Sequence, residues 1–162
     1  GLTENMTSAD NQQERLKGWI VGFTDGEGCF SVSIFRNRTS KFGWQVMPEF
    51  VITQGAKSLK VLQMTQKYFK CGKIFINKRY DNHHEHLYRY CVRKRNDLNQ
   101  IIVPFFIQNP LFTEKKQNFK IFCQVLSLMN KDRHLNKTGL LEISNLIGKT
   151  LENPQRLHAE IA

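Results

Sequence analysis

The feature that most constrains the fold is a change of hydrophobic period at residues 20–28. Before it, four apolar residues recur at the spacing of one helical face: Leu16, Trp19, Ile20 and Phe23. After Gly28, apolar and polar residues alternate, which is typical of a strand with one buried face. Asp25-Gly26-Glu27-Gly28 joins the two patterns and places two carboxylates at the junction. The sequence therefore predicts a helix that leads into a sheet.

Further changes of period order the rest of the chain. Alternation predicts strands over 45–54, 73–79 and 87–93, and helical spacing predicts a helix over 57–70. Pro48 favours a sheet edge or a bulge, and Pro104 is expected to end a short helix over 97–103. Thr113 and Thr138 are expected to cap later helices, and Asn153-Pro154 to open a last segment. We expect an α+β fold of order αββαββα with C-terminal helices, as a single domain over 13–162 after a loose segment 1–12.

Positive charge is concentrated in the middle of the chain. The net charge is +10, and residues 29–95 alone carry 14 lysines and arginines against three acidic residues, an excess of 11. Such a local excess favours a polyanion as partner. A membrane surface is the weaker candidate, because no helix pattern combines a basic face with an apolar one. We expect no apolar span, no secretory leader and a reducing compartment.

The two carboxylates at the junction lie beside this basic section and would repel phosphate without a cation between them. The oxygens of Glu27 and nearby backbone carbonyls suit Mg²⁺, and Mn²⁺ or Ca²⁺ can occupy such a site. A bound metal can activate water and stabilise a leaving oxygen. The chemistry that fits is phosphodiester hydrolysis. On these four residues alone, a simple turn after a helix stays an equal alternative.

The outward side chains of the predicted sheet are polar and basic. A β-ribbon can enter the major groove, where arginine suits guanine, asparagine and glutamine suit adenine, and glutamate can accept from cytosine. The candidate base contacts are Ser31, Ser33, Asn37, Gln45, Glu49, Asn77, Arg89 and Arg93. The candidate phosphate contacts are Arg36, Arg38, Lys41, Lys73 and Lys78. Each is alternatively a solvated surface residue, and Phe35, Met47 and Phe75 either touch thymine methyls or belong to the core.

Residues 20–28 resemble the nine-residue signature of the LAGLIDADG homing endonucleases. The resemblance extends along nearly the whole chain: it includes Phe50-Val51-Ile52-Thr53-Gln54, the segment from Pro110 to Lys116, and the stretch from Met129 to Leu141. It departs from the signature at several positions, among them Glu27 for Asp, which keeps the carboxylate on an arm one methylene longer. The resemblance implies a saddle-like antiparallel sheet and a Mg²⁺-dependent, site-specific DNA endonuclease.

The resemblance also implies roles for individual residues. Glu27 would bind the metal together with the carbonyl of Gly26, and Asp25 would orient helix ends. Gln54 would organise water at the scissile phosphate. Lys115 would support the transition state, with Lys116 as the alternative. A further basic group is expected where this chain has Ser58, so Lys57 or Lys60 would substitute.

The chain contains one such motif, whereas a double-strand break needs two cleavage centres. Four residues lie roughly opposite the apolar stripe, and small residues there allow a second helix to approach closely: Gly18, Val21, Gly22 and Asp25. We therefore expect a homodimer about a two-fold axis, acting on a long pseudo-palindromic DNA site.

Two alternatives stay open from sequence. The first is a non-cleaving binder, either an intron RNA splicing cofactor (maturase) or a DNA-binding regulator. The second concerns His83, His84 and His86, which we expect in an exposed hairpin loop near DNA rather than in a metal site. For the family implied, we expect an organelle (mitochondrion or chloroplast) or a bacterial or archaeal cytoplasm.

Overall fold

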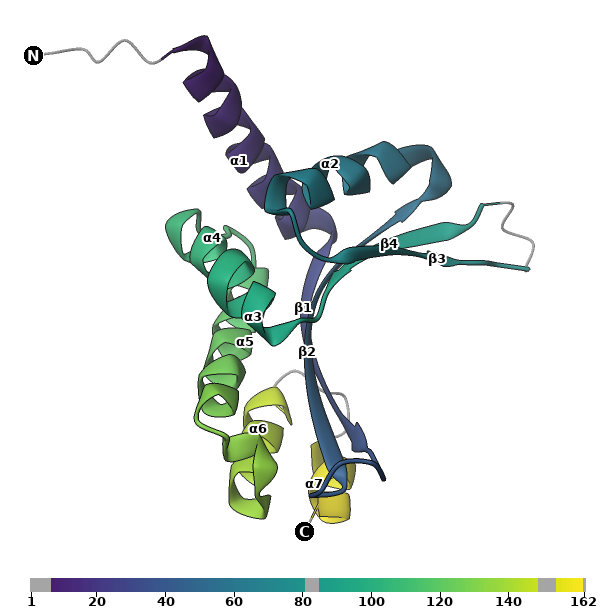
Figure 1. The fold of residues 1–162 in the computed structure, drawn as a ribbon, viewed down its shortest axis with the longest axis vertical. Coiled ribbons are helices and arrows are strands. Elements are labelled where there is room, and N and C mark those ends of the chain that lie inside the picture. The colour runs from purple at the N-terminus through teal and green to yellow at the C-terminus, as the bar shows by residue number, and fades with distance from the viewer. Residues whose placement is uncertain (1–6, 81–84, 149–153, 162) are drawn as a thin grey trace, which may run out of the picture.

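The computed structural model describes residues 7–80, 85–148 and 154–161 (Figure 1). The first half of the chain runs α1 (Ser8–Glu27), β1 (Gly28–Arg36), β2 (Trp44–Gly55), a 3₁₀ turn η1 (Ala56–Ser58), α2 (Leu59–Phe69), β3 (Lys73–Asn77) and β4 (Leu87–Val92). The second half is helical: α3 (Arg95–Asp97), a π-helical turn η2 (Leu98–Ile102), α4 (Val103–Gln108), α5 (Lys115–Asn130), η3 (Arg133–Leu135), α6 (Lys137–Gly148) and α7 (Pro154–Ile161). The expected α+β fold is confirmed.

The sheet has four antiparallel strands in the order β1-β2-β4-β3. Strand β2 pairs with β1 from Trp44 to Ile52, whereas its pairing with β4 begins only at Phe50, opposite Val92. Pro48 therefore lies where the second side of β2 is a free edge, as its missing N–H requires. The hairpin β1–β2 and the hairpin β3–β4 diverge as two arms, with the helices α4 to α6 on one side (Figure 1).

Two hydrophobic clusters hold the helices against this sheet. The upper cluster is aromatic and joins α1, β1, β2, α4 and α5, with Phe30 within ring contact of Phe50, Phe106 and Phe119. The second cluster lies against the turn end of the β1–β2 arm and joins Val46 to Val125, Leu140 and Ile161. Burying each such side chain contributes about 1.5–3 kcal/mol. The helices α6 and α7 therefore support the turn end of the β1–β2 arm.

Three helix boundaries differ from those expected. Helix α1 begins at Ser8, because Thr7 and Asp10 form a reciprocal capping box, so the expectation of a loose segment up to Gln12 is wrong for Ser8–Gln12. Pro104 does not end its helix: η2 shifts the hydrogen-bond register just before it, and Pro104 occupies the first turn of α4. Helix α6 is capped by Asn136, whose Oδ1 accepts the Gly139 N–H at 2.8 Å, rather than by Thr138.

Along the described part of the chain, no helix combines the length and the apolar character needed to cross a bilayer. The hairpin tip at 81–84 lies outside the described residues, and so do His83 and His84. His86 is exposed, and its Nδ1 accepts the backbone N–H of Arg79.

Candidate functional site

The junction between α1 and β1 is a direct passage from helix to strand. Gly28 caps α1 by donating its N–H to the carbonyl of Thr24, and it starts β1 opposite Ile52. Gly28 is buried, and a Cβ there would lie 2.7 Å from Cγ2 of Thr24, so a side chain would force the junction apart. Gly26 and Glu27, just before it, are exposed. The close junction thus presents the Glu27 carboxylate at the N-terminal end of β1.

Asp25 ties the last turn of α1 to the loop before α5. Its carboxylate accepts the backbone N–H groups of Phe112 (2.8 Å) and Thr113 (3.1 Å) and the hydroxyl of Thr113 (2.7 Å). Desolvation acts to raise the pKa of Asp25, but these hydrogen bonds and the charge of Lys115 outweigh it, so the pKa lies below its usual value. This set of bonds fixes where α5 begins relative to Glu27.

Lys115, the first residue of α5, reaches back to the same helix end. Its Nζ donates to the carbonyl oxygens of Thr24 (3.1 Å) and Asp25 (3.0 Å). The ammonium thus lies at the negative end of the α1 dipole. Lys116 is exposed and lines a different hollow, with Ile107, Phe112 and Phe119. Of the two lysines, Lys115 is the one beside the junction.

Gln54 lies level with the same helix end. The register pairs Gly28 with Ile52, so Gln54, two residues further along β2, is level with the last turn of α1. It is half-buried on the side of the sheet that faces the helices. Lys57 and Lys60 are exposed on η1 and α2, and the Lys57 N–H donates to Glu85 at 2.8 Å. That either lysine supplies the basic group expected near Ser58 stays a prediction.

The donors at the end of α1 fit a hard divalent cation. The carbonyl oxygens of Gly26 and Glu27 lie beyond the last helical hydrogen bond, which Gly28 gives to Thr24, and the Glu27 carboxylate is exposed beside them. Oxygen donors of this kind suit Mg²⁺, which keeps several waters. Among the described residues, no three His, Cys, Asp or Glu side chains converge. This chain therefore offers a one-carboxylate site with room for other ligands.

The open face of the sheet carries the outward residues that the alternation predicted. The register places Ser31 and Ser33 opposite Glu49 and Met47, and Arg89 opposite Phe75. Most of the candidate contacts are exposed or half-buried: Ser31, Ser33, Arg36, Asn37, Arg38, Lys41, Gln45, Lys73, Asn77, Lys78, Arg89 and Arg93. Phe35 and Phe75 are also exposed on this face, at 39% and 43%, and so are not core residues.

Some of these side chains are already engaged. Arg36 stacks on Trp44 and donates to the backbone carbonyl of Glu160, which ties α7 to the far end of the β1–β2 arm. The Asn37 amide donates to the side chain of Gln45 at 2.8 Å across the turn. These contacts order the tip of the arm.

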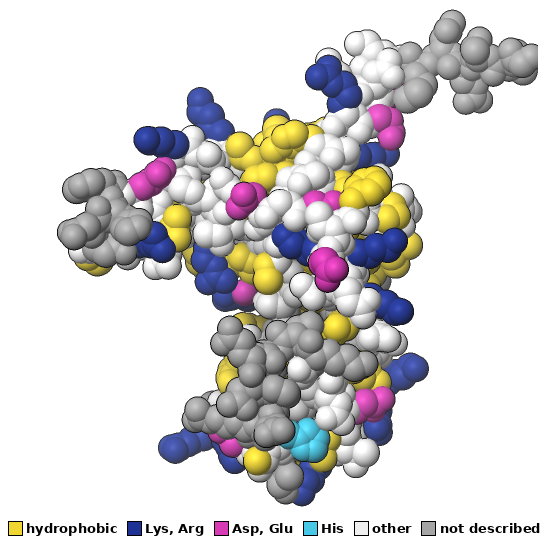
Figure 2. Space-filling view, turned by 180° about the vertical axis from the view of Figure 1, so that it is seen from behind, with side chains coloured by type: hydrophobic (Ala, Val, Ile, Leu, Met, Phe, Trp, Pro, Cys, Tyr) yellow, Lys and Arg dark blue, Asp and Glu magenta, His cyan; other side chains and the backbone are white. Residues whose placement is uncertain are grey.

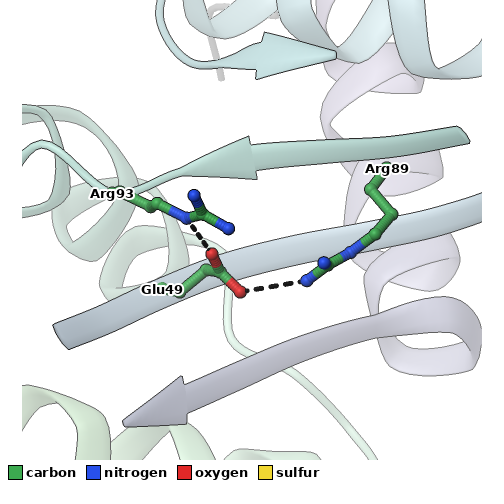
Figure 3. A network of polar contacts seen from close by, with 3 residues as sticks. All are labelled: Glu49, Arg89 and Arg93. Carbon is green, nitrogen blue, oxygen red and sulfur yellow. Dashed lines mark hydrogen bonds and ion pairs between the residues drawn. The ribbon is translucent and has the colours of Figure 1, made fainter. Parts of the chain in front are cut away.

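Glu49 departs from expectation. It lies on the open face, but it is only 6% exposed, and its two carboxylate oxygens bind Arg89 (3.2 Å) and Arg93 (Figure 3). The bond from Glu49 raises the pKa of Arg93. Both oxygens of Glu49 thus already have charged partners in the single chain, and its hydrogen bond from cytosine stays a prediction.

Of the interface residues expected on α1, two are exposed and two are already engaged within the chain. Gly18 and Gly22 are exposed, and a Cβ on either would have nothing within 4 Å. Val21 is 5% exposed and packs into the chain's own core, and the carboxylate of Asp25 is bound to the loop before α5. The open strip of α1 is therefore formed by Gly18, Gly22 and Gly26, and Figure 2 shows hydrophobic side chains to both sides of this helix.

The partners at the junction are not apparent from the sequence. Thr113 was expected to cap α5, and its Oγ1 does accept the Lys115 N–H at 3.3 Å, but it also bonds Asp25, which lies far away in sequence. The pairing of Glu49 with two arginines was missed too. The available signal was that Glu49 is the single acidic residue of residues 29–80.

The fold and these sites define an α+β protein with a basic, open sheet and an acidic helix end at its head. The family model described as LAGLIDADG endonuclease matches residues 20–126. The chain belongs to that family, which confirms the resemblance seen in the sequence.

Individual relatives agree with the family. The solved structure of the homing endonuclease I-TnaI is 40% identical, with a TM-score of 0.77 over 90% of this chain and 97% of that one. I-SmaMI, solved bound to an uncleaved DNA target with calcium ions, is 34% identical, with a TM-score of 0.76 over 87% of this chain and 48% of that one. The DNA endonuclease I-CeuI of Chlamydomonas moewusii is 32% identical over 73% of this chain and 54% of its own length.

Some curated relatives are much longer than this chain. Probable intron-encoded endonuclease 3 of Neurospora crassa is 32% identical over 86% of this chain, which covers 25% of that protein. The chain spans 25–29% of the first three curated relatives that it matches.

Proposed function

We propose that this chain is a subunit of a site-specific DNA endonuclease that hydrolyses phosphodiesters with Mg²⁺. The observation that carries the proposal is the position of Glu27: an exposed carboxylate beside backbone carbonyls that lie beyond the last helical hydrogen bond, at the start of β1 in an open sheet lined with arginines and lysines. The sheet would bind the polyanion, and the helix end would bring the metal to it.

Double-stranded DNA is the proposed substrate. A two-stranded ribbon fits the major groove, and the β1–β2 arm is such a ribbon with polar side chains on its open face. I-SmaMI, a relative with this fold, was solved on a DNA target. The names of relatives also include intron-encoded proteins, and we propose the same genetic setting for this chain.

Each residue at the junction would have a separate role in hydrolysis. Glu27 and the carbonyl of Gly26 would hold the cation, which supplies an activated water and neutralises charge on the scissile phosphate. Gln54, level with the same helix end, would orient water there. Lys115 would place a positive charge beside the reacting phosphate once DNA competes with the α1 carbonyls for its Nζ.

A second copy would complete the enzyme. The described part of the chain has one such helix end, and I-SmaMI, which is about twice as long, aligns with it over 48% of its length. The strip formed by Gly18, Gly22 and Gly26 has no side chains, so a second α1 can approach it closely. We propose a homodimer whose two-fold axis passes between the α1 helices and whose DNA site is pseudo-palindromic.

Selection from a random DNA library tests the proposal, because the protein itself picks out its site from the pool. The protein is first allowed to bind in Ca²⁺, and the enriched sequence is then placed in a supercoiled plasmid and treated with Mg²⁺ or with EDTA. We expect linear plasmid with Mg²⁺ alone. Tight binding to DNA or to intron RNA without hydrolysis in Mg²⁺ or Mn²⁺ would instead support a splicing cofactor or a regulator.

A further inference from the structure

The centre of the open face holds two arginines bound to one buried carboxylate. Arg89 and Arg93 project from β4 and its C-terminal end, and Glu49 lies between them on β2 (Figure 3). At about 3.3 Å per residue, the two arginine Cα atoms are about 13 Å apart along the strand. Because both side chains reach the same carboxylate, their guanidinium groups converge to within about 7 Å of each other.

The convergence leaves defined edges of both guanidinium groups free. Arg93 uses Nε for Glu49, so its two terminal nitrogens remain available, and Phe75 packs 5.5 Å from its guanidinium carbon. Arg89 uses Nη2, so its Nε and Nη1 remain available. The arginine side chains are 39% and 44% exposed, whereas that of Glu49 is 8% exposed. Glu49 therefore orients both arginines from the buried side and leaves their solvent-facing donors accessible to a ligand.

A planar, pre-oriented guanidinium fork matches the O6 and N7 of guanine, and it also matches a phosphate. A phosphate contact can be made by charge alone, which the exposed Lys73 on the same face also supplies, whereas the O6 and N7 of guanine need two aligned donors. Glu49 also removes one of the two positive charges, so this cluster contributes less to general DNA affinity than two free arginines would. If the cluster served only to raise affinity for DNA, the carboxylate would be a disadvantage, because it neutralises one positive charge.

The register places this cluster near the proposed cleavage centre. Arg89 pairs with Thr53, and Thr53 lies one step beyond the Gly28–Ile52 pair, level with Glu27. Two strand spacings of about 4.8 Å separate the end of α1 from β4, so the Arg89 backbone lies about 10 Å from that of Glu27.

We infer that Arg89 and Arg93, held by Glu49, recognise guanines about two base-pair steps apart, close to the cleaved step. A separation of about 7 Å corresponds to about two steps of DNA at 3.4 Å each. Glu49 is a positioning residue here, and the arginines determine specificity. The inference rests on the proposed endonuclease function, because it takes the open face to lie in the major groove.

The test is library selection in Ca²⁺ with the wild type and four variants: Arg89→Lys, Arg93→Lys, Glu49→Gln and, as control, Lys73→Ala. We expect the wild type to require guanines at fixed positions in each half-site. Each Arg→Lys change should lower the preference for its own guanine about tenfold or more and leave the other positions unchanged. Lys73→Ala should weaken all sequences alike and flatten the salt dependence by about one phosphate contact.

Glu49→Gln separates recognition from mere stabilisation of the sheet. Removal of the charge should strengthen binding to random DNA, steepen its salt dependence and weaken the guanine preference. Thermal unfolding shows whether Glu49→Gln is folded. If it is not, Arg89→Lys and Arg93→Lys decide whether the arginines recognise guanine. Guanine preferences that are unchanged in Arg89→Lys and Arg93→Lys would overturn the inference while leaving the endonuclease intact. A wild type that enriches no sequence would overturn both.

Discussion

The carboxylate of Asp25 bonds both the backbone N–H and the hydroxyl of Thr113, so the last turn of α1 and the start of α5 form one unit. The two segments are 88 residues apart in the chain. The adjacent Lys115 strengthens the unit by binding the carbonyls of Thr24 and Asp25. Any change that loosens this unit should move Lys115 relative to Glu27.

Asp25→Asn should lower stability in a pH-dependent way. The pKa of Asp25 is depressed in the folded chain, so its stabilising effect is present above the usual carboxyl pKa and is lost as pH falls through the folded value. We expect a loss of about 1–3 kcal/mol at pH 7, typical of hydrogen bonds to a charged group. Denaturant unfolding at pH 7 and near pH 3 checks this. An equal loss at both values would show that the charge of Asp25 contributes nothing.

Lys115→Met and Lys116→Met should separate the two lysines. Only Lys115 has an Nζ bound at the end of α1, whereas Lys116 is exposed beside Ile107 and Phe112. We expect Lys115→Met to slow cleavage about a hundredfold, as the loss of one charge-stabilising donor does. Single-turnover cleavage of the selected site measures both variants. The assignment fails if Lys116→Met is the slower enzyme.

Gly22→Leu should leave the subunit folded and weaken the dimer. A Cβ at Gly22 meets nothing within 4 Å in the single chain, so the change is compatible with its own fold and improves helix propensity. Across a two-fold axis the leucine would keep the helices apart. Sedimentation velocity should show a shift towards monomer, with an unchanged circular dichroism spectrum. Ser127→Leu, on the exposed side of α5, is the matched control, and equal behaviour of the two variants would argue against an α1 interface.

Local patterns were sufficient to predict most of the fold. Alternation placed Arg89, Cys91 and Arg93 on one face of β4, and Tyr88, Tyr90 and Val92 on the other, as the register confirms. The hydrophobic patterns gave wrong helix boundaries where hydrogen bonds, rather than hydrophobic spacing, determine where a helix begins or ends. The helix continues through Pro104 because a π turn absorbs the missing donor, and nothing in the hydrophobic spacing indicates such a turn.

The site was predictable in its parts but not in its pairings. The sequence indicated Glu27 and Asp25 at a helix end, and the family resemblance indicated Lys115, but which of them meet depends on how α1 and α5 cross. Val21 illustrates the same limit, since a helical wheel placed it with Gly18 and Gly22, whereas packing against the core covers it. Glu49 and its two arginines lie on neighbouring strands whose register no local pattern determines.

The most direct measurement is cleavage of a supercoiled plasmid by the wild type, by Glu27→Gln and by an equimolar mixture of the two that has been allowed to exchange subunits. The plasmid carries the selected site, and binding of all three preparations is checked in Ca²⁺. We expect linear DNA from the wild type, intact DNA from Glu27→Gln, and an excess of nicked circles from the mixture, because a mixed dimer cuts one strand. Linearisation by Glu27→Gln at the wild-type rate would show that the Glu27 carboxylate is not required for cleavage.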